Sequence, residues 1–265
     1  MHWKRVLTAL VFIPLFFGLV RYLPVYAFAV FIGAGALAAL WEYAQLLHAR
    51  GWVASRFVFV AAGLASAATL AFKPSAHRML AASASLAVVF LVASLARPQR
   101  SMEQRFLSIG ASLFGACCVG MGLGIQVPLR AHGAEWIFLL YLAVWLGDTF
   151  AFYVGRTLGR HPMAPEVSPR KTWEGAVGHV LGGLIGAIAA KMLFFHTPGW
   201  DIAVIAGILL SLAAQLGDLS ISLLKRAAGA KDSGALLPGH GGVLDRADSL
   251  LFAAPLLFIY SRIVS

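Results

Sequence analysis

The chain has 265 residues, of which 60% are hydrophobic and only 12% charged, and its formal net charge at pH 7 is +10. Soluble domains carry about 25% charged residues, so this composition excludes an ordinary soluble globular domain and indicates a polytopic membrane protein. The positive charge does not indicate a nucleic-acid-binding protein. The basic residues are scattered in short segments between hydrophobic runs, where membrane topology explains them better.

The hydrophobic runs predict an all-α fold, a bundle of about nine transmembrane helices in a single transmembrane domain. A spanning helix needs about 20 apolar residues. The predicted spans, in chain order, are Val6–Val20, Val25–Trp41, Val53–Phe72, Met79–Ala96, Phe106–Leu129, Trp136–Val154, Trp173–Phe195, Ile202–Leu224 and Ser249–Ile263. The first and last runs are short. The stretch from Val6 to Trp41 fits either two short spans or one span with a re-entrant piece.

The chain divides by charge into two halves. Eight of the eleven acidic residues lie at or after Asp148. We therefore expect residues 1–135 to form a hydrophobic scaffold half and residues 136–265 to form the catalytic half. The adjacent Cys117 and Cys118 lie in an apolar run, which favours two small buried side chains over a disulfide or zinc site.

The distribution of Lys and Arg predicts the orientation of the bundle. With nine spans and the N-terminus in the cytoplasm, fifteen Lys and Arg residues lie inside and six outside. This bias agrees with the rule that cytoplasmic loops are positively charged. Without the two polar loops described below, the count falls to seven inside and six outside. The predicted orientation therefore depends on those two loops being cytoplasmic.

The first polar stretch runs from Trp145 to Gly175. It begins with Asp148 inside an apolar run, and a charge at the centre of a membrane helix costs about 2.5–3.5 kcal/mol on insertion scales. An ionisable residue in that position suggests a functional site. Gly155–Arg156 and Gly159–Arg160 predict a basic, flexible exit from the membrane. A polar segment then leads into the seventh predicted span, with Ser168, Pro169, Arg170, Lys171 and Thr172 in sequence.

Several of these residues also have purely structural interpretations. Asp148 fits a helix-packing acid paired with a nearby Arg. Thr172 fits the N-cap of the next helix, a role that leaves Lys171 able to reach a phosphate. Arg156 and Arg160 fit ordinary anchors at the cytoplasmic membrane surface. His179, in the middle of a predicted span, is expected to pack or to form a hydrogen bond.

The second polar stretch runs from Gln215 to Asp248 and starts inside an apolar run. Asp218, Ser222 and Lys225 have helical spacing and therefore share one face. Further charges and glycines follow them: Arg226, Lys231, Asp232, the glycine-rich turn 238–242, Asp245, Arg246 and Asp248. Carboxylates bind hard cations, Lys and Arg neutralise phosphates, and glycines let backbone N–H groups approach an anion. Together they predict a site for a metal-bound polyphosphate.

These two stretches closely resemble the phosphatidate cytidylyltransferases, also called CDP-diacylglycerol synthases. The C-terminal stretch matches that family's long motif at Ser222, Lys225, Arg226, Lys231, Asp232, Gly234, Leu237, Pro238, Gly239, His240, Gly241, Gly242, Asp245, Arg246 and Asp248. The earlier stretch matches two shorter elements at Trp145, Asp148, Thr149, Ser168, Pro169, Lys171, Thr172, Glu174 and Gly175. Residues before about 140 fit the family only as a generic hydrophobic half.

The resemblance implies transfer of a cytidylyl group from CTP to phosphatidate, giving CDP-diacylglycerol and pyrophosphate. It implies Mg²⁺ as cofactor, with room for a second metal or a monovalent cation, and a homodimer. Because one substrate is a lipid and the other a cytoplasmic nucleotide, we expect an inner-membrane protein in the bilayer with cytoplasmic active-site loops and no nucleic-acid partner. The expected catalytic residues are Asp218, Asp245, Lys225 and Lys171.

Metal and substrate roles follow from the same two stretches. The expected metal ligands are Asp218 and Asp245, with Asp148 and Asp248 next. The expected substrate-binding residues are Ser168, Lys171, Thr172, Ser222, Arg226, Lys231, His240, Gly241, Gly242 and Arg246. Two roles stay open, because His240 could shape its loop rather than touch substrate and Asp248 could cap the last helix rather than bind metal.

Two other functions fit parts of the sequence. Intramembrane acids such as Asp148 and Asp218 also occur in secondary transporters and channels. That class has no need for the glycine-rich, charged loop at the membrane edge, and binding of CTP with Mg²⁺ distinguishes the two. A polyprenol or phytol kinase also brings CTP to a membrane lipid, but its product is a phosphorylated alcohol.

Overall fold

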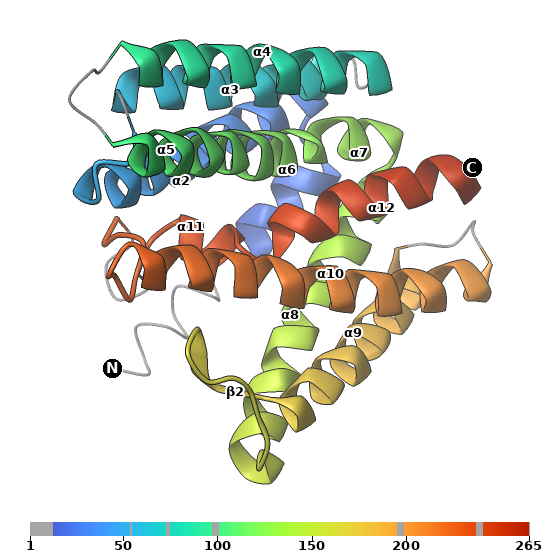
Figure 1. The fold of residues 1–265 in the computed structure, drawn as a ribbon. Coiled ribbons are helices and arrows are strands. Elements are labelled where there is room, and N and C mark those ends of the chain that lie inside the picture. The colour runs from blue at the N-terminus through green and yellow to red at the C-terminus, as the bar shows by residue number, and fades with distance from the viewer. Residues whose placement is uncertain are drawn as a thin grey trace. The chain divides into compact units, whose positions relative to one another are not determined.

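A computed structural model describes residues 13–53, 55–72, 75–96, 101–194, 199–236 and 241–264, which are mostly helical (Figure 1). Contacts divide the chain into two units. The first joins Met1–Ala131 with Ala228–Ala247, and the second joins His132–Ala227 with Asp248–Ser265. The loop that carries much of the C-terminal motif thus packs with the N-terminal part of the chain.

Six described helices are long and apolar enough to cross a membrane, which confirms the predicted class of helical membrane protein. They are α2 (Val25–Ala49), the composite helix Met102–His132, α8 (Ala134–Leu158), α9 (Trp173–Leu193), α10 (Trp200–Ala227) and Leu244–Val264. Two other predicted spans form α3 (Arg56–Phe72) and α4 (Ala76–Leu95), whose apolar stretches are shorter. Residues 6–12 of the predicted span Val6–Val20 lie outside the described residues, so the count of nine stays a prediction.

The first unit contains α2, α3, α4 and an irregular fifth helix. That helix consists of α5 (Met102–Gly115), the π-helical turn η1 (Ala116–Met121), α6 (Gly122–Gly124) and α7 (Gln126–His132). The Tyr43 and Phe59 rings stack with centroids 5.4 Å apart, and Tyr43 Oη donates to Ala111 O at 2.9 Å. A Cβ at Gly120 would collide with Gly63 O. The fifth helix is therefore irregular where it touches the α3 backbone.

The second unit contains α8, α9, α10 and α12 (Leu250–Val264). Glycines on α9 bring it against α8: a Cβ at Gly182 would lie 2.7 Å from Phe150 Cβ, and one at Gly186 would lie 2.7 Å from Ala143 Cα. Small residues at such positions let membrane helices approach closely, so that dispersion contacts can hold them together. The apolar run of α9 is thus shaped for packing against α8 on one side.

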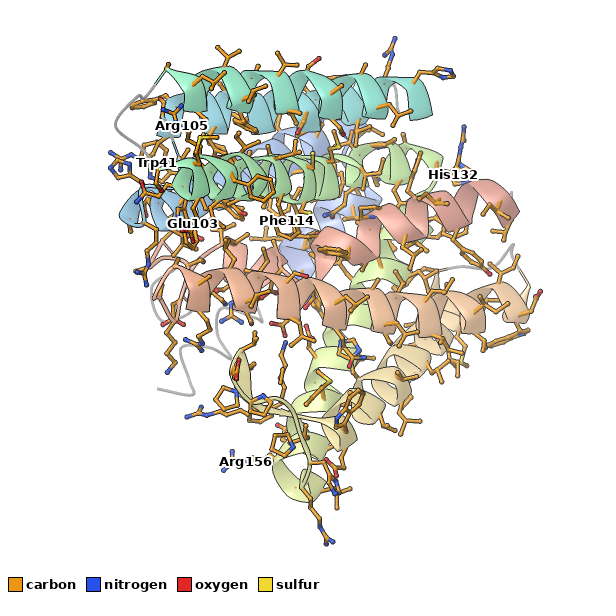
Figure 2. The ribbon with its side chains drawn as sticks, viewed as in Figure 1. Trp41, Glu103, Arg105, Phe114, His132 and Arg156 are labelled. Carbon is orange, nitrogen blue, oxygen red and sulfur yellow. The ribbon has the colours of Figure 1, made fainter. Side chains whose placement is uncertain are left out.

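A short hairpin joins α8 to α9. Strand β1 (Pro162–Ala164) pairs antiparallel with β2 (Ser168–Thr172), with Pro162 opposite Thr172. The sequence predicted only a polar loop here. The predicted flexible exit at Gly155–Arg156 is wrong, because α8 continues to Leu158 and carries Arg156 in its last turn (Figure 2). Gly155 lies within the helix, and because it has no side chain α8 can pack closely beside Gly175 there.

The segment between α10 and α12 contains the short helix α11 (Leu244–Ala247). Helix α11 packs against α2 within the first unit. The chain then enters α12, which packs against α10 and α8 in the second unit. The first polar stretch lies in the second unit, and the second stretch is divided between the two units. The side chains of each unit are therefore described separately.

Candidate active site

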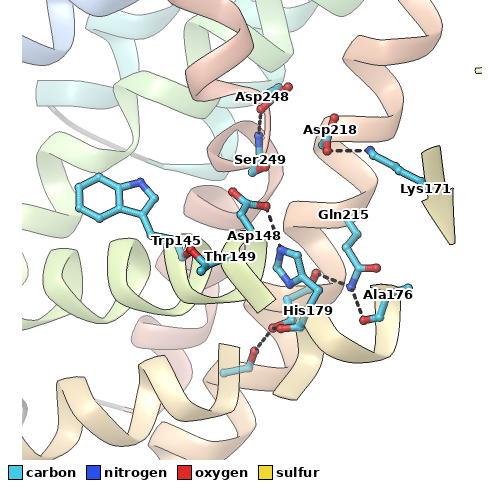
Figure 3. Close-up of polar contacts among 12 residues, drawn as sticks. Trp145, Asp148, Thr149, Lys171, Ala176, His179, Gln215, Asp218, Asp248 and Ser249 are labelled. Atoms are coloured by element: carbon cyan, nitrogen blue, oxygen red, sulfur yellow. Dashed lines mark hydrogen bonds and ion pairs between the residues drawn. The ribbon is translucent and has the colours of Figure 1, made fainter. Parts of the chain in front are cut away.

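The first group lies in the second unit and contains Asp148, Lys171, His179, Asp218, Ser222, Lys225 and Asp248; we call it the α10 group. Figure 3 shows Asp148, Lys171, His179, Asp218 and Asp248 of this group. The second lies in the first unit and contains Glu42, Ser233, Gly242 and Asp245; we call it the Glu42 group. Asp218 and Asp245 belong to different groups. Their predicted joint metal site therefore stays a prediction.

Asp218 lies near the centre of the α10 group. Lys171 Nζ, from the end of the hairpin, lies 2.7 Å from Asp218 Oδ2 (Figure 3). One helical turn after Asp218, Ser222 donates through Oγ to Asp218 Oδ1 at 3.2 Å. The predicted shared face of Asp218 and Ser222 is confirmed. Both oxygens of the Asp218 carboxylate are thus held by polar partners, one of them cationic.

The strand that carries Lys171, β2, is held at each of its ends. Thr172 Oγ1 accepts from Gly175 N at 3.1 Å, which confirms Thr172 as the N-cap of α9. Arg226 Nε, at the end of α10, donates to Val167 O at 3.1 Å. Arg226 was expected to bind phosphate; the structure shows it tying the hairpin to α10. These two contacts position Lys171 beside Asp218.

Glu174, a residue of the family-like motif with no predicted role, closes the base of the hairpin. Its Oε2 accepts from Arg160 N at 3.1 Å and from His161 N at 3.3 Å. His161 Nδ1 lies 2.6 Å from Glu174 Oε1. Glu174 thereby fixes the end of α8 relative to the start of α9.

Asp148, on α8, faces a histidine rather than an arginine. His179 on α9 is only 3% exposed, and its Nε2 lies 3.2 Å from Asp148 Oδ1 (Figure 3). A Cβ at Gly147 would lie 2.6 Å from His179 Nδ1, so the glycine makes room for the ring. The suggested pairing of Asp148 with an Arg is not what the structure shows. His179 is buried, as expected, and its ring lies beside the Asp148 carboxylate.

Asp248 completes the acids of the α10 group. It is 8% exposed, and its Oδ1 accepts from Ser249 N at 2.8 Å just before α12. The charges of Asp218, Lys225 and Asp148 all act on it. Lys225 is itself 9% exposed and supplies positive charge among these acids. Three of the four predicted metal ligands therefore belong to one group of the second unit.

The donor set of the α10 group fits a magnesium site that is completed by substrate. Among the residues described, no three His, Cys, Asp or Glu side chains are close enough to share a metal ion. Mg²⁺ commonly takes one or two protein carboxylates and draws its other ligands from substrate phosphates and water. Asp218 and Ser222 offer oxygen ligands of that kind, and the Lys171 ammonium shows that Asp218 accommodates a cation.

Glu42 forms the centre of the second group, although sequence reasoning assigned it no role. This α2 residue is 1% exposed. Its Oε1 accepts from Val243 N at 3.1 Å, and its Oε2 accepts from Leu244 N at 2.9 Å and from Ser233 Oγ at 3.0 Å. A lone acid at the end of an apolar run was the signal that could have identified it.

Asp245 organises the same loop. Its Oδ2 accepts from Ser233 N at 2.9 Å and from Gly242 N at 3.2 Å, and it lies 2.9 Å from Ser233 Oγ. Gly241 has φ +83°, a conformation that favours glycine. The Gly242 N–H, expected to face phosphate, points to Asp245 in this structure.

Three further predicted site residues are at least partly exposed. Lys231 and Arg246 are exposed, and Ser168, at the start of β2, is half-buried. His240 lies outside the described residues, so its two readings stay open. The predicted site residues that the structure describes are thus found in both units.

Comparison with known proteins gives one family. A profile of the Cytidylyltransferase family matches residues 3–264. A phosphatidate cytidylyltransferase of Brucella abortus is 43% identical over 153 residues, which cover 58% of this chain and 56% of the relative. One from Staphylococcus saprophyticus is 43% identical over 156 residues, covering 58% and 59%. The matched region thus spans little more than half of these relatives' length.

Proposed function

This chain belongs to the Cytidylyltransferase family, and we propose that it transfers the cytidylyl group of CTP to phosphatidate, giving CDP-diacylglycerol and pyrophosphate. The relatives' names support this choice of substrates. The observation that carries the proposal is the Lys171–Asp218 ion pair at the polar end of α10. Such a cluster at the end of an apolar helix is suited to a water-soluble polyanion meeting a membrane lipid.

The chemistry requires little acid–base catalysis. A phosphate oxygen of phosphatidate, already anionic, attacks the α-phosphorus of CTP. The bond from that phosphorus to the bridging oxygen breaks, and pyrophosphate leaves with the electron pair. The main barriers are the repulsion between two polyanions and the charge that develops on the leaving group, so positioning and charge neutralisation supply the catalysis.

Side chains of the α10 group suit that task. We propose that Lys171, Lys225 and Arg226 neutralise phosphate oxygens, and that Lys231 also binds substrate. Ser222 holds the Asp218 carboxylate in place through its hydrogen bond. His179 lies beside Asp148 in the same group.

We also propose a magnesium cofactor. Within the α10 group, Asp218 would be its first ligand, with Asp148 and Asp248 as further candidates, and Asp245 as a ligand stays a prediction from the sequence. When bound, Mg²⁺ would neutralise charge on the triphosphate and the leaving pyrophosphate. The oxygen donors of these carboxylates are the type that a hard cation prefers.

The apolar helices indicate a membrane protein, and a bilayer location suits the proposed lipid substrate. We propose the bacterial inner membrane, with the hairpin and the loop between α10 and α12 on the cytoplasmic side, because CTP is cytoplasmic. The acyl chains of the lipid substrate would remain in the bilayer while its headgroup reaches the α10 group. A homodimer is part of the proposal.

The test uses detergent-purified protein with phosphatidate and CTP labelled at the α-phosphate. Mg²⁺ is supplied, and a parallel reaction contains EDTA. Label in lipid-extractable CDP-diacylglycerol, lost with EDTA, supports both the transferase and its metal requirement. A folded protein that gives no labelled lipid contradicts the proposal, and a phosphorylated alcohol as product would indicate a lipid kinase instead.

A further inference from the structure

The buried acid on α2 accepts hydrogen bonds from residues that lie about 200 positions later in the sequence. Glu42 is 1% exposed inside an apolar helix, where an unsatisfied carboxylate is costly. Three donors compensate for this burial: Val243 N, Leu244 N and Ser233 Oγ. All three come from the loop between α10 and α12. One side chain of α2 therefore contacts both ends of the segment 233–244.

At two glycines of that segment, the backbone packs so closely against the Glu42 carboxylate that no side chain would fit. A Cβ at Gly234 would lie 2.6 Å from Glu42 Oε1. At Gly242, a Cβ would collide with Glu42 Oε2 and with Ser233 Oγ. These positions need glycine because the backbone closes directly onto Glu42. The glycines at 234 and 242 therefore have a packing role that does not depend on substrate.

Ser233 connects Glu42 to Asp245. Its Oγ lies 3.0 Å from Glu42 Oε2 and 2.9 Å from Asp245 Oδ2. A serine hydroxyl has one proton, so it donates fully to only one carboxylate at a time. The orientation of Asp245 is thus coupled to Glu42 through Ser233. Gly242 N–H, which also donates to Asp245, lies in the same closed loop.

We propose that Glu42 is a positioning residue, which holds Ser233, Val243 and Leu244 in the arrangement that fixes the Asp245 carboxylate. It acts through the loop and does not touch substrate. The kinetic consequence rests on the proposed function, because it assumes that Asp245 serves cytidylyl transfer. The anchoring itself is a property of the fold and can be measured without any reaction.

The central variant is Glu42→Gln. Its amide keeps the size of the side chain but replaces one acceptor oxygen with an NH₂ donor, so either Val243 N or Leu244 N loses its partner. Ser233→Ala cuts the same connection with a smaller change and carries the test should Glu42→Gln fail to fold. Glu103→Gln is the matched control, because Glu103 is an exposed acid of the same unit (Figure 2).

Hydrogen–deuterium exchange of the peptide covering residues 241–247 gives the first readout. We expect faster exchange in Glu42→Gln and Ser233→Ala than in wild type or Glu103→Gln, measured at a temperature where all four proteins are folded. The second readout is the kinetics of CDP-diacylglycerol synthesis. Partners that orient a ligand typically change activity by about 10–100-fold when mutated, so we expect kcat/KM to fall in that range and the Mg²⁺ requirement to rise.

A double variant tests the coupling. If Glu42 acts through Ser233, Glu42→Gln combined with Ser233→Ala should lose less activity than the product of the two single losses. Unchanged exchange, or kinetics of Glu42→Gln equal to those of Glu103→Gln, would overturn the proposal. If the wild-type protein makes no CDP-diacylglycerol, the proposed function fails, and the exchange comparison alone decides whether Glu42 anchors the loop.

Discussion

Lys171 Nζ lies 2.7 Å from Asp218 Oδ2, which links the hairpin between α8 and α9 to the middle of the polar face of α10. The Thr172 cap and the Arg226–Val167 contact hold the hairpin in place on either side of this ion pair. A carboxylate and an ammonium in contact can separate when a cation and a phosphate arrive, because each then gains a new partner of opposite charge. The pair is therefore suited to binding a metal–polyphosphate complex.

The first prediction concerns Asp218. Asp218→Asn keeps the side-chain shape and the Ser222 contact but removes the negative charge facing Lys171. We expect turnover to fall by roughly 10²–10³-fold, the scale seen when one preorganised electrostatic group is lost. Product formation with labelled CTP measures the effect. Asp201→Asn, an exposed acid at the start of the same helix, should retain wild-type turnover. Near-normal turnover of Asp218→Asn would remove this residue from the site.

The second prediction separates the structural role of Lys225 from its catalytic role. Lys225→Met should destabilise the protein by about 1–3 kcal/mol, because the buried Asp248 carboxylate loses compensating positive charge. Adding Asp248→Asn should restore most of that stability, since the uncompensated charge is gone. Thermal unfolding in detergent measures both.

Activity decides the catalytic part of that prediction. The stable double variant should remain poor in CTP use, because the phosphate-neutralising lysine is still missing. Recovery of normal kcat and KM together with stability would show that Lys225 only balances Asp248.

The third prediction concerns the contact between α8 and α9. Alanine favours a helix over glycine by about 1 kcal/mol, so Gly→Ala in a helix is normally neutral or stabilising. At Gly186 we expect the opposite sign, a loss of about 1–3 kcal/mol from overpacking, because the new Cβ would lie 2.7 Å from Ala143 Cα. Gly35→Ala, on α2 with no atom within 4 Å of the new Cβ, is the control. Equal melting temperatures for the two variants would argue against this close contact.

A fourth prediction tests the proposed orientation. In a background with Cys117→Ser and Cys118→Ser, single cysteines are placed at the exposed Glu166, in the hairpin turn, and at the exposed Arg262, near the end of α12. A membrane-impermeant maleimide should label Arg262→Cys in intact spheroplasts and Glu166→Cys only after the membrane is opened. Labelling of Glu166→Cys in intact spheroplasts would place the hairpin outside and contradict a site for cytoplasmic CTP.

Local features of the structure were predictable from the sequence, and distant pairings were not. The helical face shared by Asp218 and Ser222 follows from their spacing, and the Thr172 cap follows from a threonine directly before an apolar run. His179 facing Asp148 depends on how α8 and α9 pack, which no local pattern encodes. The π-helical turn at Ala116–Met121 likewise reflects a neighbour, the α3 backbone near Gly63.

Counting acidic residues did not reveal the role of Glu42 in the N-terminal half of the chain. The concentration of acids after Asp148 led us to expect a chemically silent N-terminal half. A single buried carboxylate has little weight in such a count, yet it accepts three hydrogen bonds from the motif-bearing loop. The principle that singled out Asp148 and Asp218 as acids in apolar runs applies equally to Glu42.

The hydrogen bonds of Glu42 can form only late in synthesis, because their donors come much later in the chain. Ser233 follows Glu42 by 191 residues, and Val243 by 201. At about 5–20 residues per second, the ribosome needs roughly 10–40 s to make that interval. During that time α2 carries a carboxylate whose described hydrogen-bond partners do not yet exist. A nascent chain stalled before Ser233 therefore keeps an unsatisfied acid in an apolar helix, a feature by which membrane quality control can distinguish unfinished chains from finished ones.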